Sequence, residues 1–153
     1  MDMVNLGESG LMVSRLCLGA MTFGGQLDEN ASIKVLCHAL DAGINFIDTA
    51  DVYTEGASER IVGHALAGRR DQVVLASKVG GRTAPGPTGQ GLARAHVLDA
   101  IDSTLERLGT DYLDVYYMHF PDLSTPLEET LEVMNELVVA GKVRAVGMSN
   151  HPA

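Results

Sequence analysis

The sequence predicts an α/β fold of the (β/α)8 TIM-barrel type, in incomplete form: about five strands and four helices preceded by an N-terminal β-hairpin. Apolar runs of strand length start near residues 16, 44, 73, 113 and 143, at intervals of 28, 29, 40 and 30 residues. Amphipathic segments separate these runs, and this alternation is typical of a parallel sheet covered by helices. Polar residues follow strand after strand, which favours a barrel over a sheet with one switch point.

The N-terminal segment is predicted to form the hairpin and the first barrel strand. Apolar residues flank a Gly-Glu-Ser-Gly turn at 7–10, so residues 3–16 pair as a hairpin. The run at 16–20 is the first strand of the barrel. Gly24 and Gly25 follow it and allow either a turn or a close approach of the backbone to another group.

Helical spacing of apolar residues predicts four helices between and after these strands. Ser58 is expected to cap the second helix, because its hydroxyl can accept a backbone N–H. Pro126 suits the first turn of the fourth. The buried face of the fourth helix is expected to hold Leu131, Met134, Leu137 and Val138. The predicted helices span residues 29–42, 58–68, 94–108 and 126 to about 140.

The long irregular segment at 80–91 is rich in glycine and lies between a strand and a helix. Its glycines Gly86, Gly89 and Gly91 do not have the G-x-G-x-x-G spacing, and the segment is too long for the tight turn of a dinucleotide fingerprint. Loops of this length in compact domains are often functional. Two interpretations remain, a flap over a substrate or cofactor and a plain linker.

Composition narrows the classes of function. The 153 residues are 46% hydrophobic and 20% charged, with a net charge of -9. Such an acidic chain repels phosphate backbones and anionic lipid, so neither nucleic acid nor a membrane is an expected partner. Cys17 and Cys37 have no metal-site spacing, and no leader or membrane span is evident. A single domain over 1–153, cytoplasmic and without metal, is expected.

An incomplete barrel has exposed edges. A full (β/α)8 barrel takes about 250 residues, and five strands leave unpaired backbone at both sides of the sheet. We expect either that the remaining half of the barrel covers these edges or that two copies associate through them.

Ionisable side chains lie at or just after three successive strand ends. Asp48 closes the strand near 44 and Tyr53 follows in the next loop, while Lys78 and His119 close the next two strands. The carboxyl ends of parallel strands meet at one edge of a barrel, so these four groups are expected to share one pocket. A loop-capping aspartate and a rim tyrosine would explain the first pair alone, but not the coincidence at three ends.

The motifs around these residues resemble the aldo-keto reductase family along the whole chain. The resemblance rests on residues 43–53, on Ser77-Lys78, on Met-His-Phe-Pro-Asp at 118–122 and on Val-Gly-Met-Ser-Asn at 146–150. The Gly-Ala-Met-Thr-Phe-Gly-Gly segment at 19–25 is similar to the bacterial and potassium-channel-β-like branch.

The resemblance implies reduction of an aldehyde or ketone by hydride from a reduced nicotinamide, with NADPH as the expected cofactor. Tyr53 would then be the proton donor, and an ammonium such as that of Lys78 would stabilise its phenolate form. Asp48 would hold Lys78 charged and oriented. His119 would orient the carbonyl and donate a hydrogen bond to the developing alkoxide.

The same resemblance implies cofactor contacts. Gly19, Ala20 and Met21 would lie against the nicotinamide riboside beside Asp48, and Ser149 with Asn150 would bind the carboxamide. A tight strand exit and a helix N-cap are the structural alternatives for these two groups. The family holds the adenosine 2′-phosphate and pyrophosphate mainly with loops after the seventh and eighth strands, which the five predicted strands do not include.

Two other functions are weighed. A catalytically inactive half-barrel module that self-associates would keep the four groups as relics. A phosphate-binding lyase or isomerase is disfavoured, because the phosphate loops of such barrels follow strands seven and eight.

Overall fold

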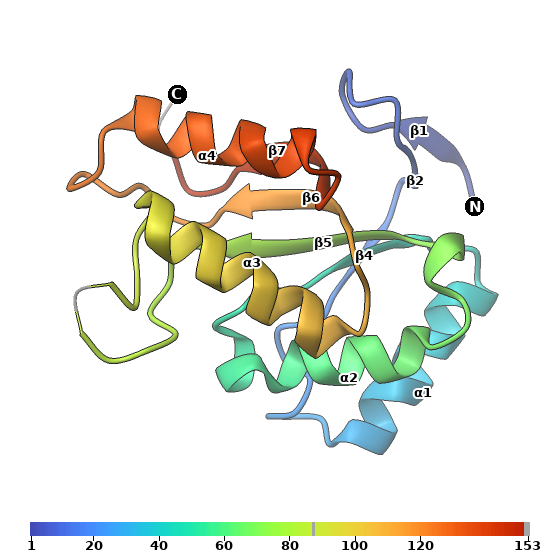
Figure 1. Cartoon of the computed structure of the whole chain (residues 1–153). Coiled ribbons are helices and arrows are strands. Elements are labelled where there is room, and N and C mark those ends of the chain that lie inside the picture. The colour runs from blue at the N-terminus through green and yellow to red at the C-terminus, as the bar shows by residue number, and fades with distance from the viewer. Residues whose placement is uncertain (87, 152–153) are drawn as a thin grey trace.

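The computed structural model describes residues 1–86 and 88–151, and it confirms an α/β fold with one parallel five-stranded sheet. The order of the strands in the sheet is their order in the chain (Figure 1). Each strand is therefore paired with the strand before it through a single helical crossover, as in a (β/α)8 barrel. The strands are β3 (Cys17–Gly19), β4 (Phe46–Asp48), β5 (Val74–Val79), β6 (Leu113–Met118) and β7 (Val143–Met148).

Parallel register brings the carboxyl ends of the strands to one edge of the sheet. Gly19 lies opposite Asp48, Lys78 opposite Tyr117, and Met118 opposite Met148. The chain leaves each strand at this edge into a loop. The groups at these strand ends are thereby brought within reach of one another.

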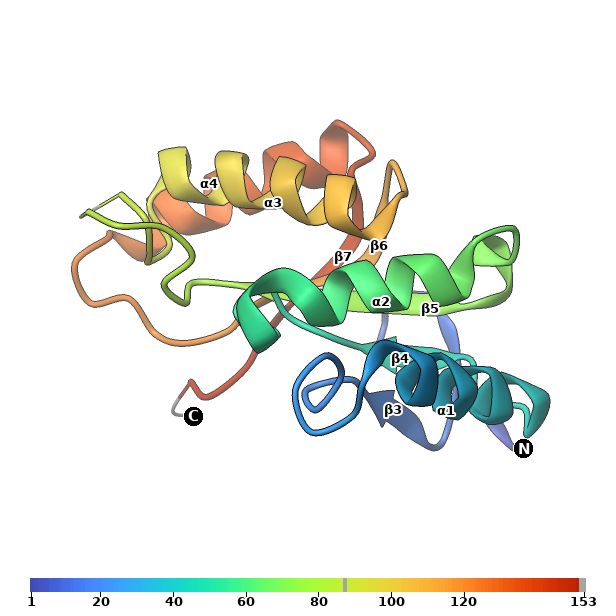
Figure 2. The same cartoon turned by 90° about the horizontal axis from the view of Figure 1, so that it is seen from below.

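Four helices cover one face of the sheet, each beside the next, so that the sheet curves as an arc (Figure 2). Asp28 caps the first by accepting the N–H of Ala31 at 2.8 Å, and Gly109 ends the third in a left-handed conformation with φ of 64°. The helices are α1 (Glu29–Asp41), α2 (Ala57–Leu66), α3 (Arg94–Leu108) and α4 (Leu127–Val139), with short 3-10 turns η1 (Tyr53–Gly56) and η2 (Arg70–Gln72).

Apolar side chains fill both faces of the sheet. The larger cluster lies between the strands and the helices, and includes fully buried Ile47, Leu75 and Ile101. A smaller cluster on the opposite face includes Val13 of the N-terminal hairpin, formed by β1 (Met3–Asn5) and β2 (Met12–Ser14). The predicted hairpin is thus confirmed, and it covers the inner face of the arc near the amino ends of the strands.

Two local predictions are wrong. Ser58 does not cap α2, because the helix begins one residue earlier after Gly56, whose φ is 80°. Leu131 and Val138 are 46% and 36% exposed rather than buried. They project from the side of α4 that no other described helix covers. The side chains that α4 buries are Thr130, Val133, Met134 and Leu137.

The segment at 80–91 is irregular, as predicted, apart from residue 87, which lies outside the described residues. The N–H of Gly91 returns to the carbonyl of Gly80 at 3.0 Å. Leu92 donates to the Asp122 carboxylate at 2.8 Å, which ties this loop to the one after β6. No helix in 1–86 or 88–151 is long and apolar enough to cross a membrane.

Candidate active site

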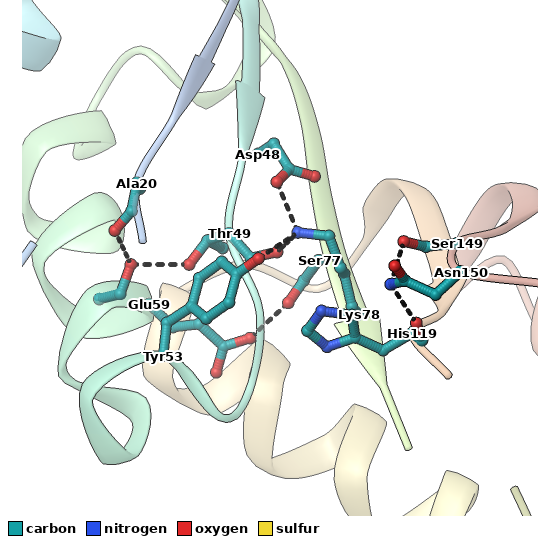
Figure 3. A network of polar contacts seen from close by, with 11 residues as sticks. Ala20, Asp48, Thr49, Tyr53, Glu59, Ser77, Lys78, His119, Ser149 and Asn150 are labelled. Atoms are coloured by element: carbon teal, nitrogen blue, oxygen red, sulfur yellow. Dashed lines mark hydrogen bonds and ion pairs between the residues drawn. The ribbon is translucent and has the colours of Figure 1, made fainter. Parts of the chain in front are cut away.

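The side chain of Lys78 lies at the centre of the predicted site (Figure 3). Its ammonium nitrogen donates to Asp48 Oδ1 at 2.5 Å, to the carbonyl of Thr49 at 2.8 Å and to the phenolic oxygen of Tyr53 at 3.1 Å. Lys78 is only 7% exposed. Three acceptors therefore satisfy the three donors of the ammonium and fix its position.

The loop that carries Tyr53 is tightly constrained. Thr54 and Glu55 have φ of 50° and 55°, a left-handed conformation that is unfavourable for residues other than glycine. The Thr54 hydroxyl donates to the carbonyl of Phe23 at 2.6 Å, and Gly56 completes the left-handed run. This geometry turns the chain sharply and directs the phenol of Tyr53 back towards Lys78 (Figure 3).

Asp48 is the counter-ion of Lys78. Burial raises the pKa of Asp48, and the hydrogen bond and charge of Lys78 act in the opposite direction. Desolvation thus disfavours the negative charge of Asp48, and the Lys78 ammonium offsets this cost. A phenol that touches this ammonium has a cation beside its oxygen, which stabilises a phenolate formed when the proton is given up.

His119 lies on the other side of the phenol. Its ring centroid is 5.8 Å from that of Tyr53 in an edge-on arrangement, and it stacks on Phe120 at 4.1 Å. Burial, and then the charge of Lys78, lowers the pKa of His119 to about 4. The imidazole is therefore neutral at physiological pH, where it can donate one hydrogen bond.

All four predicted catalytic side chains are brought together at one edge of the sheet. Asp48 and Tyr53 meet Lys78 directly, and His119 faces Tyr53. A carbonyl oxygen placed between the phenol and the imidazole could receive a proton from one and a hydrogen bond from the other. The arrangement suits proton donation to a carbonyl oxygen.

A buried group of hydrogen bonds supports the loop from behind. Ser58 Oγ lies 2.8 Å from Thr49 Oγ1 and donates to the carbonyl of Ala20 at 2.7 Å. Ser58 and Thr49 are both completely buried. These contacts join β3, β4 and α2 behind the catalytic groups, and they explain why Ser58 points inward instead of capping its helix.

Buried Glu59 and half-buried Arg107 form a second supporting group that sequence reasoning missed. Glu59 accepts from the Ser77 hydroxyl at 2.6 Å through one oxygen and from Arg107 Nε at 2.6 Å through the other. Ser77 and Glu59 are completely buried. A buried acid followed 48 positions later by its arginine partner leaves no local pattern in a sequence, so only the fold reveals this pair.

Asp51 has an unusual environment among the described residues. It is 2% exposed, and neither of its carboxylate oxygens has a hydrogen-bond partner there. Burial first, and then the negative charge of Glu59, raises its pKa to about 7. The carboxyl lines a cavity of about 240 Å³ under the loop at 80–91, which Arg107 also borders.

The residues expected to contact a cofactor differ in their accessibility. Met21 is 64% exposed, and a side chain added at Gly19 would meet no atom within 4 Å. Ala20 is completely buried, and its carbonyl is used by Ser58. Open surface thus lies beside Asp48 at Gly19 and Met21, whereas Ala20 is buried and its backbone N–H and carbonyl both form hydrogen bonds within the chain.

Ser149 and Asn150 follow β7 at the same edge. The amide nitrogen of Asn150 donates to the carbonyl of His119 at 3.0 Å and to Ser149 Oγ at 2.9 Å. Asn150 itself has φ of 59°. Its two amide protons are used within the chain, and its amide oxygen can still accept a hydrogen bond from a bound carboxamide. Within 1–86 and 88–151, no group of three or more metal-binding side chains occurs.

Known proteins resemble this chain along nearly its whole length. The profile of the Aldo/keto reductase family matches residues 15–153. The chain is 43% identical, over 98% of its length, to the aldo-keto reductase YhdN of Bacillus subtilis. It is 45% identical, over 92% of its length, to a probable voltage-gated potassium channel subunit beta of Arabidopsis thaliana. The expected likeness to the bacterial and channel-β branch is confirmed.

A solved structure shows the same likeness in three dimensions. The holo form of the aldo-keto reductase AKR11C1 from Bacillus halodurans superposes with a TM-score of 0.90 at 39% identity, over 98% of this chain and 50% of that one. The chain covers 47% of the YhdN sequence and 44% of the Arabidopsis one, and so spans about half the length of the relatives it matches. With the family profile matched from residue 15 onwards, the chain belongs to the aldo/keto reductase family.

Proposed function

We propose that this chain carries the proton-donating part of an NADPH-dependent reductase that converts aldehydes and ketones to alcohols. The contact between Lys78 Nζ and Tyr53 Oη, at 3.1 Å and with Asp48 behind it, is the observation that carries the proposal. Reduced nicotinamide would supply the hydride. The preference for NADPH over NADH follows from the family resemblance alone, whereas the cytoplasmic location that we propose rests on the two cysteines, whose sparse use suits a reducing compartment.

In this mechanism Tyr53 gives its proton to the carbonyl oxygen of the substrate. The ammonium of Lys78 stabilises the phenolate that results, and Asp48 keeps the ammonium oriented. Neutral His119 donates a hydrogen bond to the same oxygen as negative charge develops there. Tyr53 and His119 must both contact the carbonyl oxygen of the substrate. The edge-on approach of the His119 ring to the Tyr53 ring is consistent with this requirement.

The surface beside these groups fits a flat ring. The open space over Gly19, exposed Met21 and the free amide oxygen of Asn150 would hold a nicotinamide and its carboxamide. The net charge of -9 opposes an anionic cofactor, so residues outside these strand ends would have to bind its phosphates. We therefore expect the chain alone to bind NADPH weakly.

The test is titration of the 153-residue chain with NADPH, followed by tyrosine fluorescence and thermal shift, and then by oxidation of NADPH with a panel of aromatic and aliphatic aldehydes. We expect micromolar to millimolar binding and slow turnover. The Tyr53→Phe variant is the control, because it should bind without turnover. Absence of binding at millimolar NADPH would contradict the proposal.

A catalytically inactive, self-associating module is the second candidate, favoured by exposed apolar surface near the last strand. Val139, Val146 and Met148 are 80%, 44% and 63% exposed. Among the described residues, β3 pairs only with β4 and β7 only with β6. Light scattering after size-exclusion chromatography separates the cases: a concentration-dependent dimer supports association, and a monomer at all concentrations counts against it.

A further inference from the structure

An ion pair between buried Glu59 and half-buried Arg107 lies directly behind the candidate active site. Ser77 and Lys78 are neighbours on β5, so their side chains point to opposite faces of the sheet. The Lys78 ammonium reaches Tyr53 on one face, and on the other the Ser77 hydroxyl donates to Glu59 at 2.6 Å. The hydrogen bond of Glu59 thus acts on the strand at the residue next to Lys78.

Glu59 is also connected to the loop that carries Tyr53. It lies in the first turn of α2, which continues directly from η1. The side chain of Arg107 supports this turn, because an added Cβ at Gly56 would lie 2.7 Å from Arg107 Cδ. The backbone at Gly56, in the turn that follows Tyr53, therefore packs directly against the Arg107 side chain. Glu59 thus binds β5, which carries Lys78, and Arg107 contacts the turn that follows Tyr53. The spacing of these two elements sets the distance between the lysine and the phenol.

Among residues 1–86 and 88–151, the Glu59 carboxylate has one salt-bridge partner. Its side chain is completely buried, and Arg107 is its salt-bridge partner at 2.6 Å, with a side chain 20% exposed. Arg107 also donates to Thr104 at 3.2 Å on its own helix, α3. Removing one member of a buried pair leaves an uncompensated charge, which the structure can relieve only by taking up a proton or by moving. Either response alters the hydrogen bond to Ser77.

We infer that Glu59 and Arg107 are positioning residues, which act through Ser77 and the turn at Gly56 to hold Lys78 and Tyr53 at hydrogen-bond distance. This inference rests on the proposed carbonyl reduction and adds to it a specific support outside the reacting groups. It predicts that damage to the pair slows the chemical step without weakening cofactor binding. A displacement of about 1 Å at reacting groups can lower a rate about 100-fold.

The experiment compares Ser77→Ala, Arg107→Gln and Arg107→Lys with Arg94→Gln. Ser77→Ala removes the link to the lysine strand and leaves the ion pair intact, and Arg107→Lys restores the charge. Arg94 is the matched control, because it also lies on α3 and forms an exposed ion pair with Glu136. Each variant is first shown to be folded by circular dichroism.

For Ser77→Ala and Arg107→Gln we expect kcat to fall about 10- to 100-fold, with KM and the NADPH dissociation constant within about threefold of the parent. Arg107→Lys should recover part of the loss, and Arg94→Gln should match the parent. Loss of thermal stability with unchanged kcat per folded molecule would overturn the inference. If Arg107→Gln does not fold, Ser77→Ala alone decides the outcome.

A measurement without turnover separates this inference from the proposed function. NMR with [ζ-13C]tyrosine labelling follows the ionisation of Tyr53, assigned by its absence in Tyr53→Phe. If the chain lacks reductase activity, the proposed function fails, yet a shifted Tyr53 titration in Ser77→Ala and Arg107→Gln, absent in Arg94→Gln, still supports the positioning role. An unchanged titration in both variants overturns it.

Discussion

The ammonium nitrogen of Lys78 lies 3.1 Å from the phenolic oxygen of Tyr53, although 25 positions separate the two residues in the chain. Lys78 is the penultimate residue of β5, whereas Tyr53 begins the 3-10 turn η1 beyond the neighbouring strand β4. Parallel pairing of β4 and β5 brings these two points together. The contact therefore depends on the sheet as much as on either residue.

Tyr53→Phe is expected to abolish carbonyl reduction, because it removes the phenolic O–H that gives its proton to the substrate and whose oxygen accepts from the Lys78 ammonium. The loss should exceed about 100-fold, the lower range for a general acid. NADPH affinity should stay within about twofold, as measured by fluorescence titration. Turnover at the parental rate would show that another group donates the proton.

Lys78→Met is expected to abolish activity while the chain stays folded. Burial already raises the pKa of Asp48, so without the ammonium this carboxyl can take up a proton instead of remaining as an unpaired charge. Thermal denaturation at pH 5 and pH 8 measures the effect: the variant should be closer to the parent at the lower pH. Equal destabilisation at both pH values would contradict this account of Asp48.

His119 is expected to remain neutral throughout the range from pH 5 to pH 8, because its pKa is lowered from 6.5 to about 4. Between about pH 4 and pH 6.5, His119 is protonated in the unfolded chain and neutral in the folded chain. The contribution of His119 to stability is therefore present above about pH 6.5 and is lost as the pH falls towards 4. NMR titration of the His119 ring protons between pH 4 and pH 8 checks this.

Asp51→Asn is expected to change how stability depends on pH. The pKa of Asp51 is raised from 3.8 to about 7, so the folded chain holds its proton more tightly than the unfolded chain. Its contribution is therefore full below about pH 3.8 and is lost as the pH rises to about 7, by no more than about 4 kcal/mol. Urea denaturation of the parent and the variant from pH 4 to pH 8 measures the difference. Parallel curves would show that Asp51 is ionised throughout.

Much of the fold and the catalytic cluster can be predicted from the sequence because their signals are local or periodic. Apolar runs separated by helix-length segments predicted five parallel strands, and the ionisable residues that close them predicted that Asp48, Lys78 and His119 would meet. Such arguments work where one strand end is followed by one polar group. They need no knowledge of which helix faces which strand.

The remainder depends on pairings between distant segments. Ser58 has the composition of a helix cap, but competition from the carbonyl of Ala20 and from Thr49 draws it into the interior. Glu59 and Arg107 are typical surface residues by type, and only the approach of α2 to α3 brings them together with Glu59 buried. The exposure of Leu131 and Val138 depends on which elements pack against α4, and helical periodicity gives no information on these neighbours.

The order of strands in the sheet has a consequence for synthesis. The strands β3, β4, β5, β6 and β7 pair in the order in which they are translated, so each strand finds a partner in the strand synthesised just before it. The acid, the phenol, the amine and the imidazole all lie within the first 119 residues. The last strand, β7, supplies none of these four groups, so their residues are all translated before β7 begins.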